Sequence, residues 1–178
     1  MDYSLNNIIE PKLIQDLFTQ TFTDSEGTDE GAMIGKLAHD LLVTTDIEDL
    51  NCFTAKQGDE ICGAVIFTTL KSECGTNAAL LSPMAVATKC QGQGVGQELI
   101  SFALEIMKAV GTKLVVTYGD PQFYGKVGFE ALDEAQIQAP HKLSHPHGWI
   151  GQSLDAGTAL TLSGKTQCAP ALDDAKFW

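Results

Sequence analysis

The spacing of apolar residues changes along the chain and predicts helices at its start and strands in its middle. In residues 11–22 and about 30–43 the apolar positions recur at helical spacing, which predicts two helices. Pro11 suits the first turn of the first helix, and the polar segment 24–29 is expected to separate the two. A short first strand is expected within residues 3–9.

The middle of the chain has the pattern of strands. Residues 52–56 and 61–70 predict two strands, and the polar segment 57–60 between them predicts a hairpin turn. Residues 79–87 predict a third apolar strand. Pro83 within it has no N–H group, so a bulge or an interrupted ladder is expected there.

The second half returns to a strand–helix–strand order. A helix is expected from the glycine-rich segment that ends at residue 96 to about Val110, followed by a strand at 113–118. This crossover places the strands 79–87 and 113–118 parallel to each other. A short helix should follow at about 119–126, and the smaller features expected after it are a strand from Gly128-Phe129, a late strand at 158–162 and a docked aromatic tail at 173–178.

This order of elements predicts an α/β fold with one mixed sheet and helices on both faces. No repeat, low-complexity segment or linker divides residues 1–178, so a single domain is expected. No apolar run approaches the roughly 20 residues that a membrane span needs. The first residues show no basic region followed by an apolar one, so no secretory signal is expected.

The charge is strongly negative and unevenly distributed. The net charge is −12, and thirteen of the 23 acidic residues lie within residues 1–60, against three lysines. Such a chain repels phosphate backbones and anionic lipids, so neither nucleic acid nor a membrane surface is an expected partner. The acidic half would attract a cationic ligand, or it is a solvated surface that keeps the chain soluble.

The five cysteines are scattered, odd in number and without a CxxC motif, which indicates reduced thiols in the cytoplasm. The expected hairpin turn does not place Cys52 opposite Cys62, which argues against a disulfide between them.

The segment Gln91–Gly96 follows a predicted strand and opens a predicted helix. Its glycines let backbone N–H groups turn inward, and the start of the helix adds partial positive charge, so a phosphate or diphosphate site is one interpretation. A simple tight turn is the other. The dinucleotide fingerprint GxGxxG fails because Gln97 stands at its third glycine, and the P-loop pattern fails as well. The pattern that matches is [Q/R]xxGx[G/A].

A second motif downstream identifies a family resemblance. Residues 119–129 read GDPQFYGKVGF, and residues 81–86 before the glycine loop read LSPMAV. A QxxGxG loop followed by FYxKxGF resembles the GCN5-related N-acetyltransferase (GNAT) superfamily. The GDPxFYxKxGF wording and Ser25-Glu26-Gly27 resemble a bacterial subgroup of predicted acetyltransferases. The resemblance is clearest for residues 5–135, and residues 136–178 are expected to supply an acceptor-side loop and C-terminal strands.

The resemblance implies acetyl-CoA as co-substrate and no metal. It also implies a mostly antiparallel sheet in which one parallel strand pair splays apart, with the thioester in the gap. The central strand would offer backbone groups to the pantetheine arm, and the amides of the glycine loop would hold the diphosphate. The residues assigned to the cofactor are Met84, Ala85, Val86, Gln91, Gly92, Gln93, Gly94, Val95, Gly96 and Phe123. Lys89 and Lys126 either neutralise the phosphates or are surface lysines.

The family chemistry is attack of a neutral amine on the thioester carbonyl. Tyr124 matches the tyrosine that protonates the departing thiolate in the family; the alternative is that it only packs and hydrogen-bonds. The central strand carries no carboxylate to serve as base. Glu26, Asp29 and Glu30, in the expected loop after the first helix, are therefore the candidates for holding a cationic acceptor or relaying a proton. Asp29 could instead cap the second helix, and capping is expected of Asp120.

Other groupings suggest weaker alternatives. His141, His145 and His147 lie near one another with Cys168 further on, but their spacing matches no common zinc site, so a surface or acceptor-lining loop is expected. Cys90 is either a reactive thiol or a small buried residue. No local signature of a Ser-His-Asp or Cys-His nucleophile is present.

The sequence therefore predicts a cytoplasmic acetyl-CoA-dependent N-acetyltransferase that acts by direct attack of a primary amine of a small molecule or peptide. A polyamine, an amino sugar and a peptide amine all fit the acidic half. The alternative from another class is a non-catalytic acyl-CoA-binding or sensing module. Whether the chain acts as a monomer or a homodimer is left open.

Overall fold

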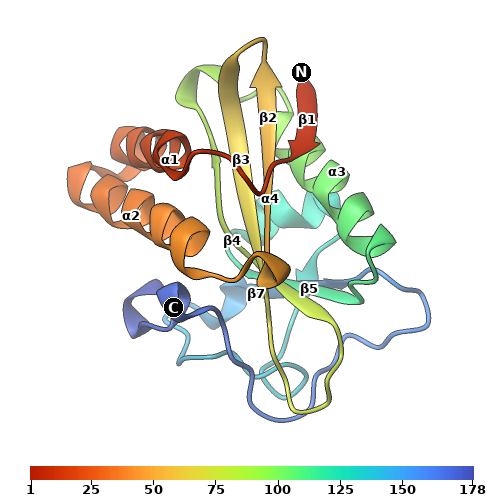
Figure 1. Cartoon of the computed structure of the whole chain (residues 1–178). Helices are drawn as coiled ribbons and strands as arrows, with labels where there is room; N and C mark the ends of the chain where they lie inside the picture. The colour runs from red at the N-terminus through yellow and green to blue at the C-terminus, as the bar shows by residue number, and fades with distance from the viewer. The chain divides into compact units, whose positions relative to one another are not determined.

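The computed structural model describes all 178 residues as an α/β fold (Figure 1). Its helices and strands are β1 (Asp2–Leu5), α1 (Pro11–Glu26), α2 (Thr28–Thr44), β2 (Leu50–Gln57), β3 (Glu60–Thr69), β4 (Ala78–Val86), α3 (Val95–Ala109), β5 (Leu114–Tyr118), α4 (Pro121–Tyr124), β6 (Glu130–Ala131) and β7 (Trp149–Ser153). The strands are hydrogen-bonded in the order β1-β2-β3-β4-β5-β7-β6. The pair β4–β5 is parallel, as predicted, within a mostly antiparallel sheet. None of the helices is long and apolar enough to cross a membrane.

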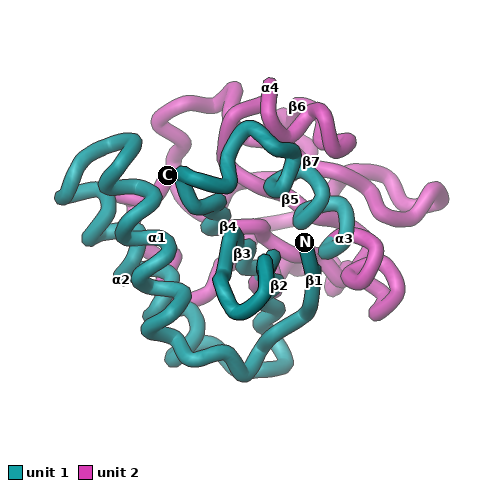
Figure 2. The backbone as a smooth tube through the Cα atoms, turned by 90° about the horizontal axis from the view of Figure 1, so that it is seen from above, with its two compact units in different colours: residues 1–67, 83–103 teal, residues 68–82, 104–178 magenta.

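The chain divides into two compact units, which Figure 2 shows in different colours. Unit 1 contains residues 1–67 and 83–103, and unit 2 contains residues 68–82 and 104–178. Strand β4 contributes its first part to unit 2 and its last part to unit 1.

Unit 1 is built on an antiparallel meander with an aromatic centre. Strand β1 pairs with β2 from Asp2 opposite Lys56 to Leu5 opposite Phe53, and β2 turns directly into β3 as the hairpin pattern predicts. Phe53 is fully buried and meets the edges of Phe67 and of Phe102, which lies on α3. Figure 1 shows α1 and α2 on one side of these strands and α3 on the other.

The first two helices meet at one glycine. The break falls within the expected segment 24–29 but is only one residue long, because α1 continues to Glu26 and α2 begins at Thr28. Side-chain hydrogen bonds support the last turn of α1: Ser25 donates to the Thr21 carbonyl and Gln20 donates to Asp24. Gly27, with φ of 100°, alone reverses the chain.

The close approach of α1 and α2 depends on Gly31. A Cβ atom placed there would lie 2.6 Å from the carbonyl oxygen of Thr19 and 2.8 Å from the backbone nitrogen of Thr23. We expect Gly31→Ala to lower the free energy of unfolding by about 1–3 kcal/mol, since backbone atoms must move apart. Chemical denaturation measures the change. The matched control is Gly125→Ala, where a Cβ meets nothing within 4 Å; equal losses for the two variants would contradict the packing argument.

Unit 2 is built around β5. The parallel register runs from Ala78 opposite Leu114 to Leu81 opposite Thr117 and ends there, two residues before Pro83. On its other edge β5 pairs antiparallel with β7. The splaying of the parallel strands stays a prediction, and the interruption predicted for the Pro83 region agrees with the end of this register.

The late strand of unit 2 is not where the sequence pattern put it. Residues 158–162 form no strand, whereas β7 lies at Trp149–Ser153. Gly151 interrupts the apolar pattern that would have predicted β7. A Cβ atom at this position would lie 2.7 Å from Leu132 Cδ1, so the strand needs a glycine there for close packing. The predicted docking of the C-terminal tail is confirmed: Trp178 is 4% exposed and its indole N–H donates to the Leu172 carbonyl at 2.9 Å.

Candidate functional site

The glycine loop has the backbone of an anion site. Gly92 and Gly94 have φ of 72° and 82°, in the left-handed region, and Gly94 accepts the hydrogen bond from Glu98 N that begins α3. The first N–H groups of a helix have no acceptor within it, so those at the start of α3 remain available. A Cβ atom at Gly92 would meet nothing within 4 Å, and one at Gly94 would meet only Glu98 Oε1 at 3.8 Å. The space in front of the loop is therefore open.

Two glutamines hold this loop in place. Gln91 Nε2 donates to the Val86 carbonyl at 2.9 Å, and Gln93 Nε2 donates to the Lys89 carbonyl at 3.3 Å. Both amide groups thus bond the loop to the end of β4 and to the residues just after it. The sequence analysis assigned Gln91 and Gln93 to the cofactor through their backbone amides, which stays a prediction; their side chains position the loop in this structure.

Of the other residues assigned to the cofactor, Phe123 lies on α4 and the rest lie along β4 and the start of α3. Met84 and Val86 are half-buried on either side of the buried Ala85, while Val95 and Gly96 are buried where α3 begins. Of the two lysines considered for the phosphates, Lys89 forms an ion pair with Glu60. Contact of these residues with a cofactor remains a prediction.

Tyr124 lies in unit 2 at the end of the short helix α4. Its ring packs edge-on against Phe123 and Phe129, with ring centres 5.1 Å and 5.5 Å apart. It also covers Gly119, where a Cβ atom would lie 2.6 Å from Tyr124 Cε2. The helix start is fixed by Asp120, whose side chain accepts from Gln122 N at 2.8 Å, so the predicted cap is confirmed.

The Tyr124 phenol is held in its protonated form. Burial raises the pKa of Tyr124 to about 12, and the negative charge of Asp120 adds to this, while a hydrogen bond with Thr117 opposes it. The Thr117 hydroxyl donates in turn to the Leu81 carbonyl at 2.7 Å. Sequence reasoning missed Thr117 and Gly119 as the partners of this phenol. Gly119 is the first residue of the Gly-Asp-Pro sequence at 119–121, which is the only sequence feature that could have pointed to either partner.

The candidate acceptor residues do not lie in a loop, which corrects the expectation from the sequence. Glu26 is the last residue of α1, while Asp29 and Glu30 occupy the first turn of α2. Asp29 does not cap α2, because Gly27 is the capping residue and no side-chain cap is formed. Asp29 and Glu30 instead place negative charge at a helix start, where it is favourable.

The histidine group has no metal-binding arrangement. His141 bonds Asp173 at 2.7 Å, and the rings of His145 and His147 lie 5.9 Å apart. No three His, Cys, Asp or Glu side chains are arranged to hold a metal ion.

All five cysteines are free, and Cys90 is buried, with burial raising its pKa to about 11. This thiol is therefore not activated, which agrees with the interpretation of Cys90 as a small buried residue rather than a reactive thiol.

Known proteins resemble this chain in sequence. A family model described as an acetyltransferase (GNAT) domain matches residues 48–131. The uncharacterized N-acetyltransferase YjhQ of Escherichia coli K12 is 32% identical over 121 residues, which are 65% of this chain and 66% of YjhQ. YhbS of the same organism is 40% identical over 50 residues, 28% of this chain and 30% of YhbS. The chain thus matches just under two thirds of the length of YjhQ and less than a third of YhbS.

Solved structures share the fold. The GNAT family N-acetyltransferase YhbS of E. coli in complex with CoA has a TM-score of 0.79 at 21% identity and covers 97% of this chain and 92% of its own. A GNAT family acetyltransferase of Brucella melitensis in complex with acetyl-CoA has a TM-score of 0.73 at 17% identity and covers 97% of both chains. The family model and the match to YjhQ show that this chain contains an acetyltransferase (GNAT) domain, and the solved structures share its fold.

Proposed function

We propose that this protein is an acetyl-CoA-dependent N-acetyltransferase that moves an acetyl group to a primary amine of a small molecule or peptide. The observation that carries the proposal is the glycine loop: left-handed Gly92 and Gly94 leave open space before the first amides of α3. Backbone N–H groups at a helix start suit a diphosphate. The CoA in the YhbS structure and the acetyl-CoA in the Brucella structure support this choice of ligand.

The proposed reaction is a direct transfer. The amine nitrogen forms a bond to the thioester carbonyl carbon, and a backbone N–H of β4 stabilises the resulting oxyanion. The C–S bond then breaks, and the sulfur takes a proton from the Tyr124 hydroxyl. Water, or a carboxylate among Glu26, Asp29 and Glu30, removes the proton that the attacking amine must lose. Solvent afterwards restores the proton of Tyr124.

The raised pKa of Tyr124 supports its part in this mechanism. A general acid must carry its proton at the working pH, and a phenol with a pKa of about 12 does so throughout the neutral range. Its packing against Phe123 and Gly119 fixes the ring in one position. A fixed and protonated donor needs little reorganisation when the thiolate departs.

The acceptor is proposed to be cationic in solution. Unit 1 holds the acidic first third of the chain, including Glu26, Asp29 and Glu30 on adjoining helix ends. Negative potential attracts ammonium ions and raises their local concentration. Polyamines, amino sugars and peptide amines are the classes to test.

The first test is calorimetric titration of the purified protein with acetyl-CoA, with free CoA in parallel. We expect saturable one-site binding of both, followed by amine-dependent release of free thiol. Absence of binding at millimolar acetyl-CoA would contradict the proposal and leave the glycine loop as a turn.

The absence of a carboxylate on β4 that could act as base favours a second candidate function, a module that binds acyl-CoA without catalysis. A non-catalytic acyl-CoA-binding or sensing module would bind acetyl-CoA yet release no thiol with any cationic amine. The same titration and thiol assay therefore separate the two functions.

A further inference from the structure

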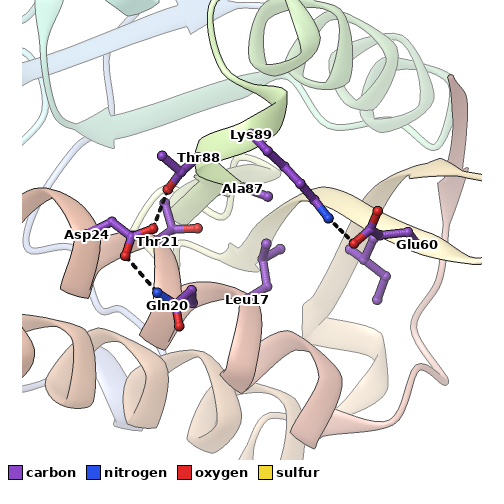
Figure 3. A pocket seen from close by; sticks show the side chains of 9 residues that line it. Leu17, Gln20, Thr21, Asp24, Glu60, Ala87, Thr88 and Lys89 are labelled. Atoms are coloured by element: carbon purple, nitrogen blue, oxygen red, sulfur yellow. Dashed lines mark hydrogen bonds and ion pairs between the residues drawn. The ribbon is translucent and has the colours of Figure 1, made fainter.

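A pocket of about 370 Å³ opens within unit 1 (Figure 3). It lies between α1, the start of β3 and the segment that follows β4. Leu17, Ile61 and Ala87 form its apolar walls. Its volume is at the small end of the range for ligand pockets, about 300–1,000 Å³. Apart from Lys89, which was considered for the cofactor phosphates, none of the residues considered above for the cofactor, the acid or the acceptor lines it.

The buried side of the pocket carries a hydroxyl group without a partner. Thr21 is 7% exposed, and its Oγ1 atom makes no hydrogen bond. Figure 3 shows this side chain among the residues that line the pocket. A buried hydroxyl that lacks a partner costs free energy, and such groups are rare in folded proteins. A ligand atom that bonds to Thr21 would remove this cost.

The rim of the pocket presents an oriented carboxylate. Asp24 accepts one hydrogen bond from Gln20 Nε2 at 2.7 Å and another from Thr88 Oγ1 at 2.6 Å, through different oxygens. The two bonds hold the carboxylate at the pocket edge, as Figure 3 shows. Each carboxylate oxygen has two acceptor positions, so Asp24 can still accept from a ligand.

The opposite rim is closed by an ion pair that a ligand can replace. Lys89 pairs with Glu60, and their side chains are 60% and 57% exposed. Exposed pairs of this kind contribute little stability, so exchanging one ammonium group for another at Glu60 costs little. With Asp24 and Glu60 against Lys89 alone, the charge at the rim is net negative.

We propose that this pocket binds a small organic ammonium ion with an apolar body, at a site separate from the glycine loop. The apolar body lies against Leu17, Ile61 and Ala87. The ammonium group donates to Glu60 in place of Lys89, while Asp24 and the Thr21 hydroxyl, on the other side of the pocket, are available to a second donor group of the ligand. An anionic ligand is disfavoured because it would meet two carboxylates and one lysine.

The site has a consequence for the loop beside it. Thr88 and Lys89, which line the pocket, come directly before Cys90 and the glycine loop. A ligand ammonium at Glu60 releases the Lys89 ammonium group next to the proposed anion site. Binding of the two ligands is therefore compatible, and any coupling between them must be reciprocal. Binding of the ammonium ion in this pocket does not depend on acetyl transfer.

The test uses 2-phenylethylammonium as the probe and nuclear magnetic resonance of the ¹⁵N-labelled full chain. We expect saturable shifts of the backbone amides of Thr21, Thr88 and Lys89, and binding at least about tenfold weaker for the neutral analogue 2-phenylethanol. Glu60→Gln should weaken binding of the ammonium probe about tenfold. Asp59→Asn removes the same charge from the adjacent residue outside the pocket and should change the affinity less than about twofold.

Three results would overturn the inference. These are equal affinity for 2-phenylethanol, equal effects of Glu60→Gln and Asp59→Asn, and displacement of the probe by saturating CoA. Displacement would show that the pocket belongs to the cofactor site. Denaturation curves of each variant check that it remains folded. The experiment contains no acetyl donor, so failure of the proposed enzymatic function leaves its outcome unchanged.

Discussion

Replacing Gly94 by valine is expected to weaken acetyl-CoA binding about a hundredfold, or about 2.7 kcal/mol. Gly94 has φ of 82°, a conformation that a β-branched residue adopts only with strain. The new side chain would also enter the open space in front of the first amides of α3. Both effects act on the backbone N–H groups that we expect to hold the diphosphate. Calorimetric titration of the variant with acetyl-CoA measures the loss.

Gly58→Val is the matched control for this experiment. Gly58 has φ of 62° in the turn between β2 and β3, and a Cβ atom there would also meet nothing within 4 Å. The substitution therefore imposes similar backbone strain away from the loop. We expect it to lower stability and to leave the affinity for acetyl-CoA within about twofold of the original. Equal losses of affinity in the two variants would show that the glycine loop does not bind the diphosphate.

Tyr124→Phe is expected to lower kcat at least about a hundredfold, because positioned proton transfer contributes about 10²–10⁴-fold. The ring keeps its packing against Phe123 and Phe129, so KM for acetyl-CoA should change little. Steady-state thiol release with a reactive amine gives both constants. The control is Tyr3→Phe, which removes the exposed tyrosine hydroxyl that donates to Glu98 and should leave kcat nearly unchanged.

The pH dependence provides an independent check on Tyr124. Its pKa in the folded protein, about 12, lies above the ordinary value of 10. The phenol therefore keeps its proton as the pH rises past 10 and loses it only near 12. Wild-type activity should show no alkaline decline from this group below about pH 11. A decline with an apparent pKa below 10 that disappears in Tyr124→Phe would contradict the assignment.

Much of the fold could be predicted because apolar spacing reports burial directly. The helix with Leu99 and Ala103 on its buried side and the β-branched strand at 114–118 were both recognised this way. Strand β7 was missed because Gly151 and Gln152 interrupt its apolar pattern, and its need for a glycine comes from Leu132, a distant residue in the sequence. The end of α1 was predicted to be a loop because its residues are polar. In the structure, hydrogen bonds from Gln20 to Asp24 and from Ser25 to the Thr21 carbonyl stabilise it as a helix.

The candidate site, like the fold, could be predicted from the sequence only in part. The glycine loop is a continuous motif, so its backbone conformation at Gly92 and Gly94 follows from local sequence. The environment of Tyr124 is not local: Thr117 reaches it from β5, and Thr117 itself bonds to β4. The pocket beside α1 combines residues from three separate segments, among them Asp24, Glu60 and Thr88. No spacing rule along the sequence identifies such a grouping.

The interleaving of the two units constrains how this chain can be made and divided. Unit 1 resumes at residue 83 after the first segment of unit 2, and unit 2 resumes at residue 104. No single cut in the chain therefore separates the two units. A fragment that ends at residue 103 contains β4 but lacks β5, the strand with which β4 pairs. During synthesis on the ribosome, residues 78–81 must wait for residues 114–117 before their parallel pairing can form. The α1–α2 hairpin needs no such delay, so we expect it to form first.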